Sequence, residues 1–347
     1  MKRVWRGVAI AAGIVAVIAV AATTTAVIGN TYAFTEREVA IPAPGGLLDG
    51  VLTMPTDGTA RGLVVMVHGD GAVDATQNGL YDPWFDGAAS SGYATLSWSK
   101  PGVGGSPGDW LAQGLADRAV EVETAIDWAR AQPEIPTTTI VLWGASQAGW
   151  VLPAVVADRD DIDGVVAVGT AVNWLRQGRF NLEAELDHDG ASPDERARAE
   201  AASAATDALL EGGARYEDYI ATTHDSAPMS RERWGFVQRN FRADATADLT
   251  RAADRRIAWL LLAGEHDRNV DVAETAEVYR GIFGDDLTVT WVDAVHSMAR
   301  PLVDDSELVG VAVGVFWPRA LLADGVIDAY RGFLTHVASA APARTRG

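Results

Sequence analysis

The chain has 347 residues, of which 48% are hydrophobic and 22% are charged, and it contains no cysteine. The lack of cysteine excludes a disulfide framework, a thiolate zinc site and a cysteine nucleophile. There are 28 Lys and Arg residues against 47 Asp and Glu residues, so the formal net charge of −19 would repel a phosphate backbone and argues against nucleic acid as a partner. The length and the apolar content predict a globular protein with a sizeable core.

The first 35 residues have the composition of an export segment. Three basic residues among the first six precede a stretch, residues 8–35, that has no charged side chain. A signal peptide cleaved near Ala19-Val20-Ala21 and an N-terminal membrane anchor formed by residues 8–28 both fit this pattern. Under either interpretation the basic end stays in the cytoplasm. We therefore expect an exported protein, secreted or held at the outer face of the cytoplasmic membrane, that contacts the membrane only through this segment.

From residue 36 onward, short β-branched segments alternate with longer amphipathic or Ala-rich segments. This alternation predicts an α/β fold with a mostly parallel eight-stranded sheet and helices on both faces. The expected strands are residues 38–41, 47–53, 63–67, 94–98, 139–143, 165–168, 257–263 and 287–292, and the expected helices are residues 115–131, 147–157, 272–282 and 326–337. The first two strands are separated by two prolines and two glycines, which predicts an antiparallel hairpin at the sheet edge.

Residues 173–250 lack strand signals and are rich in charged residues and alanine. A cap-like Ser192-Pro193-Asp194-Glu195 begins one apparent helix in this segment. We expect a helical cap insertion that covers the carboxyl edge of the sheet, where ligands bind in open α/β sheets. Residues 36–172 and 251–347 would then form the core domain.

Two glycine-rich turns follow strands in the first half of the core. The strand at residues 63–67 runs into His68-Gly69-Asp70-Gly71, and a second turn, residues 99–106, follows Trp98. The second turn does not match a phosphate-binding loop, because its lysine precedes the glycines and Pro107 occupies the last glycine position of G-x-G-x-x-G.

The segment Gly144-Ala145-Ser146-Gln147-Ala148-Gly149 lies between an apolar strand and a helix. This context is typical of a nucleophile elbow, in which small neighbours allow a sharp strand-to-helix turn. Ala148 stands where the usual G-x-S-x-G pattern has its second glycine. Ser146 is therefore the candidate nucleophile, and the free N–H groups at the start of the helix would favour a developing oxyanion.

Two later strands each lead into a loop with an acidic residue and a histidine. Residues 257–263 are followed by Gly264-Glu265-His266-Asp267, and residues 287–292 are followed by Asp293-Ala294-Val295-His296. A serine hydroxyl needs a neutral imidazole to take its proton and a carboxylate to orient that imidazole. Adjacent residues such as Glu265, His266 and Asp267 lack the spacing of metal ligands. We therefore expect no metal and no other cofactor.

The elbow and the chain order Ser146, Asp267, His296 resemble the α/β-hydrolase superfamily, near its esterase, thioesterase and dienelactone hydrolase branches. The resemblance implies that Ser146 is the nucleophile, His296 the general base, and Asp267, rather than Glu265 or Asp271, the triad acid.

The turn after residue 67 resembles the family's oxyanion loop. The resemblance implies an oxyanion hole made by the backbone N–H groups of Asp70 and Gln147, with His68 bracing the loop. The Asp70 side chain would have to point away from the oxyanion or bond to a neighbour.

We therefore expect an exported serine hydrolase that cleaves a carboxylic ester or thioester through an acyl-enzyme, with a small, neutral and apolar substrate. Trp98, Trp143 and Trp150 are candidates for the substrate pocket, and core packing explains them equally well. A short-peptide serine peptidase, an enzyme similar to acyl-CoA thioesterases and a catalytically inactive, membrane-tethered binding protein are the alternatives. Coenzyme A esters fit the acidic surface poorly. No residue pattern indicates the oligomeric state.

Overall fold

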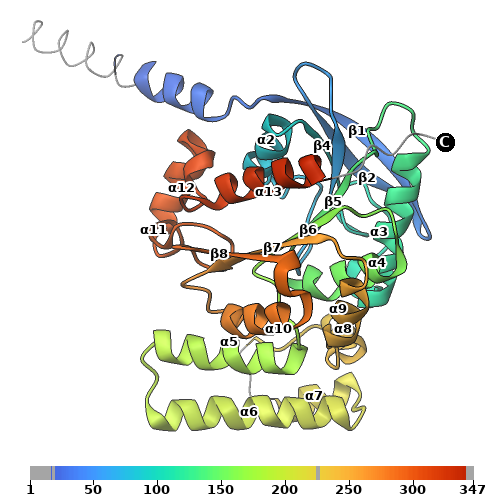
Figure 1. The fold of residues 1–347 in the computed structure, drawn as a ribbon. Coiled ribbons are helices and arrows are strands. Elements are labelled where there is room, and N and C mark those ends of the chain that lie inside the picture. Colours follow the sequence, from blue (N-terminus) through green and yellow to red (C-terminus); the bar gives the residue numbers. More distant parts are fainter. Residues whose placement is uncertain (1–16, 18–19, 224–226, 341–347) are drawn as a thin grey trace, which may run out of the picture.

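A computed structural model describes residues 17, 20–223 and 227–340, and its centre is an eight-stranded sheet (Figure 1). The strands are β1 (Phe34–Ala43), β2 (Gly46–Pro55), β3 (Gly62–Val67), β4 (Tyr93–Trp98), β5 (Ile140–Ala145), β6 (Gly164–Val168), β7 (Ala258–Gly264) and β8 (Leu287–Val292). Their order is β1-β2-β4-β3-β5-β6-β7-β8. The β1–β2 hairpin and the β2–β4 pair are antiparallel, and all other neighbours are parallel. The predicted mostly parallel sheet is confirmed.

The inner strands read as short apolar segments because both of their faces are covered. Every residue of β3, β4 and β6 is buried, as expected for parallel strands between two helical layers. By contrast, the edge strand β1 is mostly exposed.

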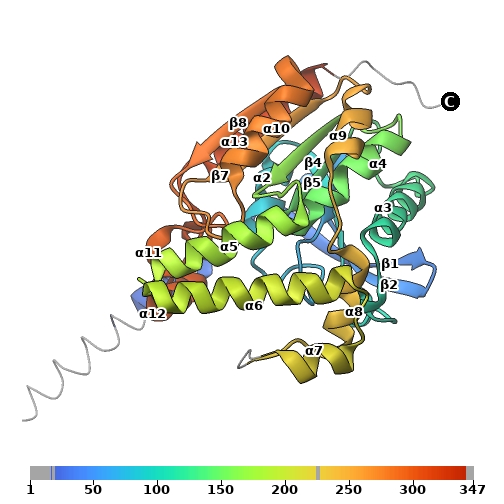
Figure 2. The same cartoon turned by 90° about the horizontal axis from the view of Figure 1, so that it is seen from below.

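Helices cover both faces of the sheet (Figures 1 and 2). One core cluster joins the sheet to α3 (Leu115–Arg130), α4 (Leu152–Asp158), α9 (Thr246–Ala253) and α10 (Val272–Phe283). The other cluster joins it to α2 (Asp82–Ser90) and α13 (Val326–Ala340). The helix predicted at residues 147–157 is divided into the 3₁₀ turn η2 (Ser146–Trp150) and α4, because Pro153 fits only the first turn of a helix.

The insertion contains the helices α5 (Trp174–His188), α6 (Pro193–Glu211), α7 (Tyr216–Thr222) and α8 (Arg231–Asn240), and no β-strand is found in its described part. These helices lie beside the sheet (Figure 2). They pack around an apolar cluster that includes Trp234 and Tyr219. Helix α9, at the end of the predicted insertion, instead packs against α4 with Leu249 fully buried.

Residues 297–325, for which the sequence predicted no element, form α11 (Pro301–Asp304), α12 (Glu307–Phe316) and the turn η4 (Pro318–Ala320). Two further 3₁₀ turns are η1 (Trp110–Ala112) and η3 (Gly284–Asp286). The predicted export segment falls mostly on residues 1–16 and 18–19, which lie outside the described residues. Within the part that is described, none of the helices has both the length and the apolarity needed to cross a bilayer.

Candidate active site

Ser146 occupies a sharp turn between β5 and η2. Its φ is +52°, a left-handed conformation that a serine adopts at a cost in strain. A Cβ on Gly149 would lie 2.6 Å from the carbonyl oxygen of Ala171, and a Cβ on Gly144 would lie 2.7 Å from the methyl group of Ala148. The turn therefore needs glycine at 144 and 149. The methyl group of Ala148 fits in the turn because Gly144, which faces it, has no side chain.

A half-buried His296 and a buried Asp267 form a pair at the carboxyl ends of β8 and β7. The Nδ1 atom of His296 lies 2.8 Å from Oδ2 of Asp267, whose side chain is fully buried. The other oxygen, Oδ1, accepts hydrogen bonds from the backbone N–H groups of Asn269 and Val270 at 2.8 and 2.9 Å. These bonds fix the direction of the carboxylate, so that the imidazole can present Nε2 to the cavity.

The other acidic residues near this loop are placed differently. Glu265 is exposed, and Asp271 caps α10 by accepting a hydrogen bond from the N–H of Glu274. His266 bonds to Asp293 at the surface, with Nε2 and Oδ1 2.7 Å apart. Among the described residues, no group of three or more His, Asp or Glu side chains has the arrangement of a metal site.

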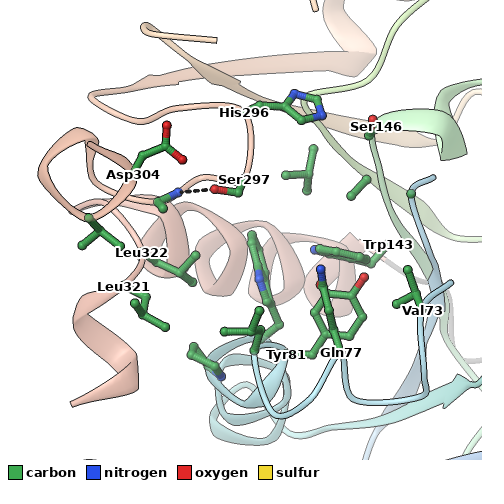
Figure 3. A pocket seen from close by; sticks show the side chains of 18 of the residues that line it. Val73, Gln77, Tyr81, Trp143, Ser146, His296, Ser297, Asp304, Leu321 and Leu322 are labelled. Atoms are coloured by element: carbon green, nitrogen blue, oxygen red, sulfur yellow. Dashed lines mark hydrogen bonds between the residues drawn. The ribbon is translucent and has the colours of Figure 1, made fainter. Parts of the chain in front are cut away.

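Ser146 and His296 line one cavity of about 490 Å³, and the imidazole faces the serine (Figure 3). Both side chains belong to the described residues, and no direct hydrogen bond joins them. In enzymes without bound substrate this bond is often long and tightens only in the substrate complex.

The loop after β3 lies directly against Ser146. A Cβ on Gly69 would be 3.3 Å from Cβ of Ser146, so a side chain at this position would crowd the serine. Within the described residues, neither the backbone N–H of Asp70 nor that of Gln147 donates to a protein acceptor. The loop and the start of η2 therefore bring two free backbone donors to the two sides of the serine.

Two buried basic side chains hold the carbonyl groups of this loop. Lys100, 2% exposed, donates from Nζ to the carbonyl oxygens of Gly69 and Gly71, and Arg118 donates to that of His68. In a trans peptide the C=O and the following N–H point in opposite directions. The bond from Lys100 to the Gly69 carbonyl therefore turns the N–H of Asp70 away from the lysine. The sequence did not single out Lys100 or Arg118 for this role.

His68 is buried beneath the loop in a neutral state. Its Nε2 lies 2.5 Å from the carbonyl oxygen of Trp98 and its Nδ1 lies 3.3 Å from the hydroxyl of Tyr81. Burial, followed by the charge of Lys100, lowers the pKa of His68 to about 3. It donates to a carbonyl and braces the loop.

The Asp70 side chain turns to the cap and to Gln147. Its Oδ1 and Oδ2 accept hydrogen bonds from Nη1 and Nη2 of Arg233 on α8, at 2.9 and 2.5 Å, and Nε2 of Gln147 donates to Oδ1 at 3.0 Å. Burial alone would raise the pKa of Asp70, but the bonds and the charge of Arg233 lower it overall. The carboxylate beside the two free N–H groups is thus neutralised by a residue of the insertion.

The cavity extends from Ser146 and His296 to the segment between α11 and α13, and its walls are mostly apolar. None of its lining residues belongs to the described part of residues 173–250. Figure 3 shows Trp143 and Tyr81 on one side and Leu321 and Leu322 on another. The apolar and aromatic lining residues are Val73, Leu80, Tyr81, Pro83, Trp84, Trp143, Ala145, Val168, Ala299, Val303, Pro318, Leu321 and Leu322.

Of the three tryptophans proposed for the pocket, only Trp143 lines this cavity. The indole N–H of Trp98 donates to Glu121 on α3 at 2.8 Å, and that of Trp150 donates to the carbonyl of Val172 at 2.8 Å. Both rings pack on the opposite face of the sheet from Trp143, so assigning them to the pocket was wrong. Trp84, which does line it, belongs to α2, a helix that the sequence analysis did not predict.

Solved structures share this fold at low sequence identity. A structure from an analysis of two fungal esterases from Rhizomucor miehei aligns with a TM-score of 0.55 and 16% identity, over 92% of this chain and 88% of that chain. Est1E from Butyrivibrio proteoclasticus with bound ferulic acid aligns with a TM-score of 0.54 and 13% identity, over 88% and 100%. The esterase Pf2001 from Pyrococcus furiosus gives a TM-score of 0.51 and 13% identity, over 82% and 91%. No curated protein matches the sequence significantly.

A family model described as "Serine aminopeptidase, S33" matches residues 58–299, a range that contains Ser146, Asp267 and His296. The match covers more than half of the chain and agrees with the sheet order and the turn at Ser146. The chain therefore belongs to this family of α/β-hydrolase serine hydrolases.

Proposed function

We propose that the protein is a serine esterase that cleaves a neutral carboxylic ester with an apolar acyl group. Ser146 attacks the ester carbonyl, and Nε2 of His296 takes the hydroxyl proton and returns it to the leaving alcohol. Asp267 orients the imidazole and stabilises its cation, and the N–H groups of Asp70 and Gln147 bind the oxyanion. Water, activated by His296, then hydrolyses the acyl-enzyme.

One observation carries this proposal. Ser146 in its strained turn, His296 and Asp70 line a single cavity, Asp267 bonds to His296, and Gln147, whose backbone N–H is free, directly follows Ser146. Each group alone has a structural explanation, but acyl transfer requires a nucleophile, a base and oxyanion donors around one point.

The cavity walls favour an apolar ester over a peptide substrate. A peptide with a free amino terminus needs an unpaired carboxylate to bind its ammonium group. Of the two aspartates that line the cavity, Asp70 is paired with Arg233, and Oδ2 of Asp304 lies 3.9 Å from Nη2 of Arg268. A short-peptide peptidase, which the family's description favours, is therefore the second candidate.

We also propose that the protein is exported and held at, or released from, the outer face of the cytoplasmic membrane. The support is the uncharged sequence of residues 8–35 after a basic start. Mass measurement of the protein from its native host distinguishes a cleaved chain from an anchored one.

A panel of p-nitrophenyl esters and aminoacyl anilides tests the substrate class. We expect ester cleavage, with kcat/KM rising about tenfold or more from acetate to hexanoate, because each added methylene contributes up to about 0.8 kcal/mol when buried. Ser146→Ala is the control for background hydrolysis. Faster cleavage of the anilides than of every ester would overturn the preference for esters.

A further inference from the structure

Helix α12 presents an apolar face to solvent. Leu308, Val311 and Val315 are 81%, 59% and 55% exposed, and residues 308–318 contain no charged side chain. Leu302, Phe316 and Trp317 extend the exposed area at the two ends of the helix. We call these six residues the α12 face. Contiguous apolar patches on soluble proteins usually mark an interaction site.

The N-terminal segment lies beside this face. Residues 20–29 are helical, and Val20, Val27 and Ile28 in them are 66%, 62% and 55% exposed. The side chain of Asn30 donates to the carbonyl of Val315 at 3.1 Å. Both ribbon views show this helix next to α12 (Figures 1 and 2).

Arg319, just after α12, fixes the connection between the two apolar segments. Its guanidinium donates to the carbonyl of Gly29 at 3.1 Å and to that of Thr31 at 2.5 Å. It also lies over the ring of Tyr32, 4.2 Å from the ring centroid. The exposed apolar parts of the two segments therefore lie on one side of the molecule.

We propose that the α12 face docks on the surface of a lipid bilayer. The uncharged segment of residues 8–28 is long enough to enter a bilayer, and the hydrogen bonds from Asn30 and Arg319 place α12 where that segment emerges. The expected lipid is zwitterionic, because Asp304, Asp305 and Glu307 precede the helix and the chain carries a net charge of −19. Anionic headgroups would repel this surface.

Residues before and after α12 form a wall of the candidate active-site cavity. Val303 in α11, Pro318 in η4, and Leu321 and Leu322 beyond it line the cavity. Docking would bring this end of the cavity close to the lipid. If the proposed esterase function holds, the substrate is an ester with a long acyl chain that enters from the bilayer.

A fluorescent probe on α12 tests the docking, and the lack of native cysteine makes a single labelling site easy to introduce. Val311→Cys in the full chain carries an environment-sensitive fluorophore, and Ala205→Cys, on an exposed position of α6, is the matched control. Phosphatidylcholine vesicles that contain nitroxide-labelled lipid should quench the probe at position 311 about twofold or more and leave the control unchanged.

Two outcomes would overturn the docking proposal. The first is quenching that is absent at position 311 or equal at the two positions. The second is a change at position 311 that depends on protein concentration without lipid, which would show that a second copy covers the face. Replacing phosphatidylcholine by anionic lipid should weaken the quenching.

The triple variant Leu308→Gln, Val311→Gln, Val315→Gln tests the route of the substrate. All three positions are exposed, so the fold should be unaffected. Hydrolysis of soluble p-nitrophenyl acetate should stay unchanged, whereas that of a long-chain ester embedded in vesicles should fall about fivefold or more. Equal rates of wild type and variant on the embedded ester would contradict the route. A protein that hydrolyses no ester but still shows quenching would contradict the proposed function alone.

Discussion

At Asp267, three hydrogen bonds hold one carboxylate in a fixed direction, two from backbone N–H groups and one from Nδ1 of His296. Asp267→Asn keeps the shape but offers the imidazole an amide, so His296 adopts the wrong tautomer and loses the charge that stabilises its cation. We expect kcat to fall about a thousandfold or more with little change in KM. Steady-state kinetics on a p-nitrophenyl ester measure this loss.

Glu265→Gln is the matched control for this substitution, because Glu265 lies two residues away and is exposed. It should keep near wild-type activity. Full activity in Asp267→Asn, or a large loss in Glu265→Gln, would move the triad acid to another residue.

His68 makes the stability of the protein depend on pH. Its pKa is about 3 in the native state, whereas the ordinary value is about 6.5. Below pH 6.5 the unfolded chain therefore binds a proton that the native protein does not. The free energy of unfolding should therefore fall as the pH decreases from 6.5 toward 3. Above pH 6.5, His68 is neutral in both states and causes no such loss of stability.

The variant His68→Gln isolates this effect, because its amide can still donate to the carbonyl of Trp98. Between pH 7 and pH 5, urea unfolding should show that the wild type loses about 2 kcal/mol more than the variant. The same pH dependence in both proteins would show that His68 is protonated in the native state.

The sequence could single out the residues that we propose for the chemistry, but not the residues that support them. Ser146, Asp267 and His296 follow apolar strands in loops of recognisable composition, and parallel strands bring their carboxyl ends to one edge. Arg118 and Arg233 carry no such local signal. They reach Gln147 and Asp70 from helices 29 and 163 residues away in sequence, and only the packing of those helices determines the contacts.

At the scale of elements, helix α8 connects the insertion to the loop that offers the Asp70 N–H. Among the described residues, Arg233→Ala would leave Gln147 as the one side-chain hydrogen-bond partner of the Asp70 carboxylate, beside the proposed position of the oxyanion. We expect kcat to fall about threefold to tenfold, since the pair is partly exposed and solvent screens its charge. The loss should reverse in the double variant Arg233→Ala, Asp70→Asn, because the amide carries no charge and the backbone N–H remains.

Arg231→Ala on the same helix is the control, because Arg231 pairs with Glu217, away from the active site. The measurement is kcat for the wild type, the two single variants at positions 233 and 70, their double variant and this control. Losses that simply add in the double variant would show that Arg233 acts through packing alone.

Elements whose apolar residues recur at a regular spacing, or that are bounded by clear turn residues, could be predicted from the sequence, and the others could not. The hairpin of β1 and β2 and the helices α3, α10 and α13 lie where the sequence placed them, to within a few residues. Helix α12 was missed because its Val and Gly residues have little helix propensity and the segment has no polar face. The residues on either side of this helix, Val303, Asp304 and Pro318, nevertheless line the cavity, so the pocket could not be predicted correctly from the three tryptophans.

At the scale of the whole molecule, charge and apolar surface are unevenly distributed. Without the first 35 residues, which contain Lys2, Arg3 and Arg6, the net charge is −22. An acidic body repels polyanions, whereas the cavity and the α12 face are apolar. This distribution suits a neutral, lipophilic substrate better than a coenzyme A ester.

The central claim is that Ser146 is a nucleophile activated by its surroundings, and a fluorophosphonate probe tests this claim most directly. The purified wild-type protein should be labelled covalently at Ser146, as mass spectrometry of its peptides would show. Ser146→Ala should not be labelled, and Ser297→Ala, which alters another serine of the same cavity, should be labelled like the wild type. A folded wild-type protein that takes up no probe, or equal labelling of wild type and Ser146→Ala, would contradict the account.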